Sequence, residues 1–74
     1  MIYPITLTSC EHAKKLSDEA AESQLGITVS YNNVILDPRS ILGLLSLVGK
    51  KIMLVAPDHS NPKDFWRLIE HVSC

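Results

Sequence analysis

The stretch Pro38-Arg39-Ser40-Ile41-Leu42-Gly43-Leu44-Leu45-Ser46-Leu47 predicts a short, unusually apolar helix near the middle of a 74-residue chain. Asp37 suits the N-cap position, where its carboxylate would accept a free backbone N–H, and Pro38 suits the first helical position, where no donor is lost. Gly49 is a natural end signal just beyond the helix. One buried face of so short a helix accommodates only about half of these apolar residues. We therefore expect the helix either to be buried on all sides or to present an apolar patch to a partner.

Length and composition indicate one domain that spans residues 1–74. A chain of this size buries only roughly 60% of its unfolded surface on folding, which leaves no room for a second core. An apolar content of 46% and a charged content of 20% are typical of a globular domain with a packed core. The net charge of -1 provides no electrostatic footprint for nucleic acid or for an anionic membrane. We therefore expect neither of these partners.

The N-terminus and the cysteine content favour a cytoplasmic protein. Residues 1–4 lack the basic region and long apolar run of a signal peptide, and no stretch approaches the roughly 18 apolar residues needed to span a bilayer. Cys10 and Cys74 are too few for a disulfide framework. We expect two reduced thiols and no membrane insertion.

Hydrophobic periodicity predicts four strands, at residues 2–8, 27–31, 34–36 and 51–56. Pro4 requires the first strand to lie at a sheet edge or to contain a bulge, because proline cannot donate to a strand ladder. Asn32 and Asn33 both tolerate positive φ angles and predict a two-residue hairpin turn between the second and third strands.

Two further helices are predicted, one before the hairpin and one after the last strand. The first would end near Gln24, and the spacing of Thr8 and Glu11 predicts a capping box with Thr8 as its N-cap. Ser60 or Asn61 would cap the last helix. The expected core residues are Ala13, Leu16, Ser17, Ala20 and, at its end, Gln24 in the first helix, and Phe65, Leu68, Ile69 and Val72 in the last. The element order is therefore βαββαβα, which predicts an α+β, open-faced β-sandwich: a four-stranded antiparallel sheet with three helices on one face.

The segment Ser40 to Leu47 also resembles the Ser-Ile-Met-Gly-Val-Met-Ser-Leu signature of HPr, the phosphocarrier of the bacterial sugar phosphotransferase system. HPr-like domains have the same βαββαβα order, and a Tyr-Asn-Gly turn precedes their serine helix where this chain has Tyr31-Asn32-Asn33. The resemblance covers nearly the whole chain, although both terminal helices and the connection after Leu47 are shorter than usual. It implies an HPr-like fold.

The resemblance implies three kinds of site residue. His12 stands at the position of the phosphoryl-accepting histidine, and Lys14 stands at the position of a nearby arginine. Ser40 matches the regulatory phosphorylation site. Ile41, Leu42 and Leu45 are assigned to partner contact, although helical spacing turns Ile41 inward with Leu44, Leu47 and Val48.

Two interpretations of His12 remain open. Phosphoryl transfer needs a free imidazole nitrogen and helix amides that cradle the phosphate. The family segment Gly-Ile-His-Ala-Arg-Pro-Ala is replaced here by residues 10–16, in which only His12 and Ala13 match, and Lys14 provides a point charge without the arginine fork. If Thr8 caps the helix, His12 lies inside it and becomes a boundary histidine beside Leu16.

Two functions from different classes follow from the resemblance. As a phosphocarrier, the chain would receive a phosphoryl group on His12 from enzyme I and pass it to a sugar permease domain. As a non-phosphotransferring regulatory module, it would dock to transcriptional regulators or to the serine kinase of HPr through the helix at Ser40–Leu47. We expect no enzymatic turnover of its own, because no acid, base and nucleophile converge near a predicted pocket. We also expect no cofactor and no metal site, and the three histidines lack metal-ligand spacing. A redox function through Cys10 is a third, weaker interpretation.

Overall fold

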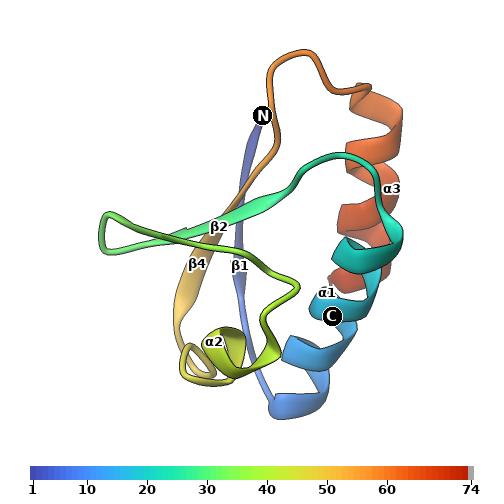
Figure 1. Ribbon diagram of the computed structural model, residues 1–74. Helices are drawn as coiled ribbons and strands as arrows, with labels where there is room; N and C mark the ends of the chain where they lie inside the picture. Colours follow the sequence, from blue (N-terminus) through green and yellow to red (C-terminus); the bar gives the residue numbers. More distant parts are fainter. Residues whose placement is uncertain (74) are drawn as a thin grey trace.

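The computed structural model describes residues 1–73, so the thiol expected at Cys74 lies outside the described residues. The elements follow one another as β1 (Ile2–Thr6), α1 (Cys10–Glu22), β2 (Thr28–Tyr31), β3 (Val34–Leu36), α2 (Ile41–Leu45), β4 (Lys51–Val55) and α3 (Pro62–Val72). Figure 1 shows this βαββαβα order along the chain, which confirms the predicted arrangement.

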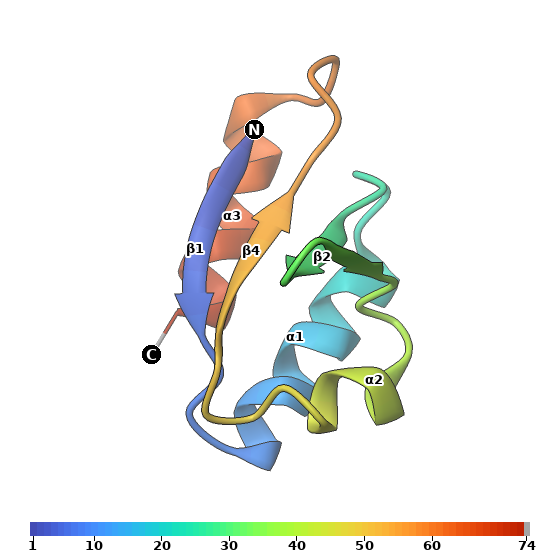
Figure 2. The ribbon, with the colours of Figure 1, turned by 90° about the vertical axis from the view of Figure 1, so that its left-hand side faces the viewer.

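The four strands form one antiparallel sheet in the order β1-β4-β2-β3. Figure 2 looks onto one face of this sheet, with α1 and α3 behind it. The helix α2 packs beside α1 near the end of the sheet where β1 ends and β4 begins (Figure 2). The architecture is therefore the predicted α+β open-faced sandwich.

Pro4 lies on β1, which is an edge strand, the first of the two predicted alternatives. At the start of this strand Met1 and Ala56 exchange both backbone hydrogen bonds, at 2.9 and 2.8 Å. Because bonded and non-bonded pairs alternate along an antiparallel ladder, residue 4 directs its backbone nitrogen away from β4. The missing N–H of proline therefore costs no ladder bond here.

The turn between β2 and β3 has the predicted conformation. Asn32 and Asn33 adopt φ angles of 49° and 65°, which suits a two-residue turn joining the paired residues Tyr31 and Val34. Two consecutive positive φ angles give the backbone twist that matches the flanking strands.

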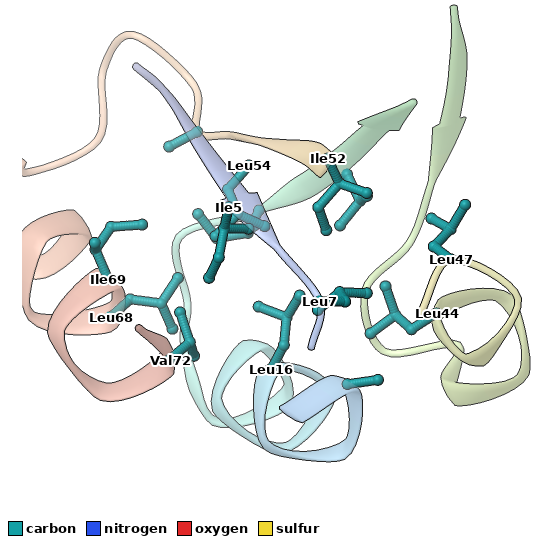
Figure 3. Close-up of a cluster of buried hydrophobic side chains, with 14 of the residues drawn as sticks. Ile5, Leu7, Leu16, Leu44, Leu47, Ile52, Leu54, Leu68, Ile69 and Val72 are labelled. Carbon is teal, nitrogen blue, oxygen red and sulfur yellow. The ribbon is translucent and has the colours of Figure 1, made fainter. Parts of the chain in front are cut away.

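The core fills the space between the sheet and the helices, as Figure 3 shows. All four predicted residues of the α3 stripe are buried, and Asn61 caps that helix by accepting the backbone N–H of Lys63 at 2.9 Å. Ala13, Leu16, Ser17 and Ala20 on the predicted core face of α1 are also buried, whereas Gln24 lies beyond the helix and is exposed. Every helix contributes to this core, including α2 through Leu44.

Several predicted boundaries were wrong by a few residues. β1 ends at Thr6 and α1 ends at Glu22, both two residues earlier than expected. The largest error concerns α2, which begins at Ile41 and not at Pro38. Its cause lies in the turn that precedes Ser40, described below.

Candidate functional site

The first turn of α1 holds His12 at its third helical position. Ser9 is the N-cap: it has an extended backbone, and its hydroxyl oxygen accepts the backbone N–H of His12 at 3.1 Å. The prediction that Thr8 caps this helix with Glu11 was therefore wrong by one residue. His12 nevertheless lies inside the helix, as that prediction implied, and its backbone amide is already engaged by the cap.

The imidazole ring of His12 is only 6% exposed and has partners at both nitrogens. Its Nδ1 atom accepts the backbone N–H of Thr8 at 3.2 Å, and the Thr8 hydroxyl lies 3.4 Å from the same atom. Its Nε2 atom forms a hydrogen bond with the main-chain carbonyl oxygen of Val72, the last residue of α3. The ring thus lies between the start of α1 and the end of α3.

These partners define the tautomer of His12. A backbone carbonyl only accepts and a backbone N–H only donates, so Nε2 carries the hydrogen and Nδ1 holds the lone pair. The nucleophilic lone pair therefore points at the N–H of Thr8 and not at solvent. Attack on a phosphoryl group would require the ring to leave at least one of these two contacts.

Further contacts of α1 lie on two sides of this helix. Glu19 lies on the same side as His12, seven residues on, and pairs with His71 of α3 at 3.3 Å. Ser17 lies on the other side, where its hydroxyl donates to the carbonyl oxygen of Arg39 at 3.4 Å. Lys14 is exposed and two residues from His12, a spacing that does not bring two helical side chains together. The spacing along α1 therefore separates the His12 side chain from that of Lys14, and Ser17 joins α1 to the turn before α2.

A tight turn at residues 37–40 explains why α2 starts late. The carbonyl oxygen of Asp37 accepts the backbone N–H of Ser40 at 2.9 Å, and the Asp37 carboxylate accepts the backbone N–H of Arg39 at 2.9 Å. The Arg39 guanidinium also pairs with that carboxylate at 2.9 Å. Side-chain and backbone hydrogen bonds from Arg39 lower the pKa of Asp37. Asp37 therefore caps a turn and not the helix, which corrects the prediction.

Ser40 occupies the N-cap position of α2, one step before the first helical turn in which it was expected. Its hydroxyl is exposed and makes no capping hydrogen bond, whereas its carbonyl oxygen accepts the N–H of Leu44 at 3.2 Å. The hydroxyl is thus accessible to a modifying enzyme, and its modification would break no capping bond of α2.

The apolar residues of α2 and of the turn that follows it are divided between core and solvent. Leu44 is fully buried and Leu47 nearly so, whereas Leu42 is 79% exposed and Leu45 is 37% exposed. Ile41 is half-buried and packs against the core. The predicted exposed pair at residues 42 and 45 is therefore confirmed, and we call it the α2 patch.

A cavity of about 640 Å³ lies between the C-terminal part of α1 and α3. Its polar lining includes Glu19, His59, Arg67 and His71, but not His12 or any residue of α2. Within residues 1–73, no three His, Cys, Asp or Glu side chains gather closely enough to hold a metal ion. None of the helices in that range is both long enough and apolar enough to cross a bilayer.

No protein-family model matches this sequence, and no curated protein sequence matches it either. Solved structures do match its fold. HPr-C-His from Thermoanaerobacter tengcongensis superposes with a TM-score of 0.73 at 19% identity, over 97% of this chain and 90% of that chain. The phosphocarrier protein HPr from Bacillus anthracis str. Ames has a TM-score of 0.70 at 16% identity, over 99% of this chain and 96% of that chain.

The layered α+β sandwich described above is thus shared with these proteins from end to end. It is the HPr-like fold, as the resemblance of the central segment implied.

The hydrogen-bond partners of His12 are the feature of this site that could not be predicted from the sequence. Its spacing of four from the core residue Leu16 was the available signal, because residues four apart lie on the same side of a helix. That spacing indicates burial, but nothing local to His12 identifies Val72 as its partner.

Proposed function

We propose that this chain is an HPr-like regulatory protein of a bacterial sugar phosphotransferase system, and that it acts by docking a partner protein onto the α2 patch. The exposure of Leu42 is the observation that carries the proposal. A leucine that is 79% exposed, on a five-residue helix whose Leu44 is fully buried, gains nothing from the core of its own domain. Its burial by a partner would be favourable by roughly 1.5–3 kcal/mol.

The surroundings of the patch suit protein docking. Leu45 extends the apolar surface, Ile41 lies at its inner rim, and neither carries a group able to do chemistry. The candidate partners are enzyme I, a permease domain, the serine kinase of HPr and transcriptional regulators. Ser40, with its exposed hydroxyl next to the patch, is the residue where a kinase would change the charge of this surface.

The contacts of His12 favour a structural function for this residue, because both of its ring nitrogens already form hydrogen bonds within the domain. They therefore support the regulatory proposal over phosphoryl transfer. A phosphoryl group on Nδ1 would displace the N–H of Thr8, and one on Nε2 would displace the carbonyl of Val72. Either step would break a hydrogen bond between the ring and the main chain, at a cost of about 1–3 kcal/mol.

A phosphocarrier is the second candidate, and the likeness to phosphocarrier structures favours it. His12 lies in the first turn of α1, close to the position that the resemblance implies. Transfer would then require the imidazole to leave at least one of its two main-chain contacts, and the exposed Lys14 side chain would have to turn towards it to supply positive charge. Enzyme I, phosphoenolpyruvate and a permease domain would be the partners.

Docking is tested by titrating the isotope-labelled chain with each candidate partner and following backbone amide shifts. We expect the largest shifts at residues 41–46, and we expect Leu42→Ser to weaken binding about tenfold or more. Val34→Ser is the matched control, because Val34 is also exposed but lies on β3. Shifts centred elsewhere, or equal losses in both variants, would contradict docking at the α2 patch.

Phosphoryl transfer is tested with enzyme I and phosphoenolpyruvate, and the product is measured by intact mass. A folded chain that gains no phosphate supports the regulatory proposal. An acid-labile gain of one phosphate that is lost in His12→Ala, but kept in His71→Ala, would establish the phosphocarrier instead. The two experiments are independent, because binding at the α2 patch does not require a modified histidine.

A further inference from the structure

The face of the sheet turned away from α1 and α3 (Figure 2) carries exposed apolar side chains on three of its four strands, with the polar residues Thr6, Thr28, Ser30 and Lys51 between them. Strand register brings Pro4, Met53, Ser30 and Ile35 into one row across β1, β4, β2 and β3. Ile35 is 71% exposed and Met53 is 41% exposed, and Ile2, in the next row, is 67% exposed. A sheet face that only meets water usually carries polar residues at such positions. We call the surface formed by Ile2, Pro4, Met53 and Ile35 the open-face patch.

Charge is nearly absent from this face. Among the outward positions of the four described strands, only Lys51 at the start of β4 is ionisable. Charged residues make up 20% of the chain, so they are placed preferentially elsewhere. This face offers almost no opposite charge to a strongly charged partner. An uncharged, apolar surface is complementary to it. A second copy of the same face has that character.

The size of the face also suits a second copy. The molecule measures 29 × 24 × 18 Å, so its broadest side spans 29 × 24 Å. A broad face of this size offers roughly 700 Å² per copy, or roughly 1,400 Å² in a pair, which lies within the range of specific interfaces. Sheets commonly pack face to face in this way.

Edge pairing is the other way in which two sheets associate, and β1 opposes it. Residue 4 directs its backbone nitrogen outward, and in Pro4 that nitrogen has no hydrogen. A second copy of β1 would therefore meet a gap in the middle of the ladder. At the opposite edge, β3 comprises only Val34–Leu36.

We propose that two copies of this chain associate face to face through the open-face patch to form an isologous dimer. A two-fold axis that runs across the strands superposes the apolar row on its own copy. The same axis places the two Lys51 side chains at opposite ends of the interface. The dimer leaves the α2 patch free, so this inference does not rest on the proposed docking function.

Sedimentation equilibrium of the full chain tests the dimer between roughly 10 μM and 1 mM, a range that detects dissociation constants up to the millimolar level. We expect the mass to rise from 8.2 kDa towards twice that value. Ile35→Lys should weaken the association about tenfold or more. Val34→Lys is the matched control, because Val34 is its exposed neighbour on β3 and points to the other face. Circular dichroism confirms that each variant is folded.

Ile2→Lys provides a second, independent disruption at the far end of the patch, and should also favour the monomer. A wild-type chain that stays monomeric at 1 mM would overturn the proposal. So would a dimer that is weakened equally by Ile35→Lys and Val34→Lys, or one that dissociates only with Leu42→Lys, which would place self-association at the α2 patch.

Discussion

The Nε2 hydrogen of His12 is donated to the main-chain carbonyl oxygen of Val72, which joins the first turn of α1 to the last residue of α3. Carbonyl groups in the last turn of a helix have no partner within that helix. His12 therefore caps α3 from another element, while its Nδ1 atom accepts the N–H of Thr8 just before α1. One buried side chain thus satisfies main-chain groups on two segments that are far apart in the chain.

Replacement of His12 by alanine should therefore cost stability. The change removes the side-chain partner of the buried Val72 carbonyl and one hydrogen bond of the Thr8 N–H, so we expect the free energy of unfolding to fall by about 2–4 kcal/mol. Urea denaturation followed by circular dichroism measures it. His59→Ala is the control, because His59 is exposed, and it should change the free energy by less than about 0.5 kcal/mol. Equal losses in the two variants would contradict a structural function for His12.

The same contacts predict the tautomer of this ring. Long-range nitrogen–proton NMR spectra of the folded chain should show His12 with hydrogen on Nε2 and a bare Nδ1, because each nitrogen faces a main-chain partner of fixed polarity. His59, which is exposed, is the internal reference for a ring that solvent surrounds. A hydrogen on Nδ1 of His12 would mean that the ring has left Thr8, and would strengthen the phosphocarrier alternative.

The turn before α2 predicts a measurable electrostatic effect. Hydrogen bonds from Arg39 lower the pKa of Asp37, so Arg39→Gln should raise that pKa towards its ordinary value. Because the folded pKa is the lower one, any contribution to stability is present above the unfolded value and is lost as the pH falls through the folded value. Carboxyl carbon shifts during an acid titration report the change. Arg67→Gln, which removes a distant guanidinium, should leave the Asp37 titration where it was.

The hairpin turn can be improved or damaged by single changes. Asn33 adopts a φ angle of 65°, which glycine accepts freely and alanine does not. We expect Asn33→Gly to be neutral or to stabilise the domain by up to about 1 kcal/mol, and Asn33→Ala to destabilise it by about 1 kcal/mol. Thermal unfolding of the two variants at one pH provides the comparison. An alanine variant more stable than the glycine variant would contradict the argument from the φ angle, and a similar loss in both variants would show that Asn33 contributes through its side chain.

The parts of the fold that were predicted correctly depend on short-range patterns. The stripe of α3, its cap at Asn61 and the Asn32-Asn33 turn each involve residues within a few positions of one another. Hydrophobic periodicity and turn preferences report on such arrangements directly. The edge position of β1 followed from Pro4 for the same reason, because the restriction is a property of proline itself.

The errors arise where two local patterns compete or where the partner is remote. Asp37 could cap either a helix or a turn, and its pairing with Arg39 stabilises the turn. Thr8 and Ser9 are both good N-cap residues, and the sequence did not indicate which of the two would cap α1. The hydrogen bond from His12 to Val72 joins residues 60 positions apart, so only the tertiary structure reveals it.

The final prediction separates the two functions of α2, core packing and docking. Leu44 is fully buried, so Leu44→Ala should lower the free energy of unfolding by about 2–5 kcal/mol through lost contacts and a residual cavity. Leu42→Ala should change it by less than about 0.5 kcal/mol, because that side chain is mostly in solvent. Urea denaturation of the two variants under identical conditions measures the difference. A large loss of stability in Leu42→Ala would mean that this leucine is covered within its own domain. The exposed surface on which the docking proposal depends would then not exist, so this comparison should precede any search for partners.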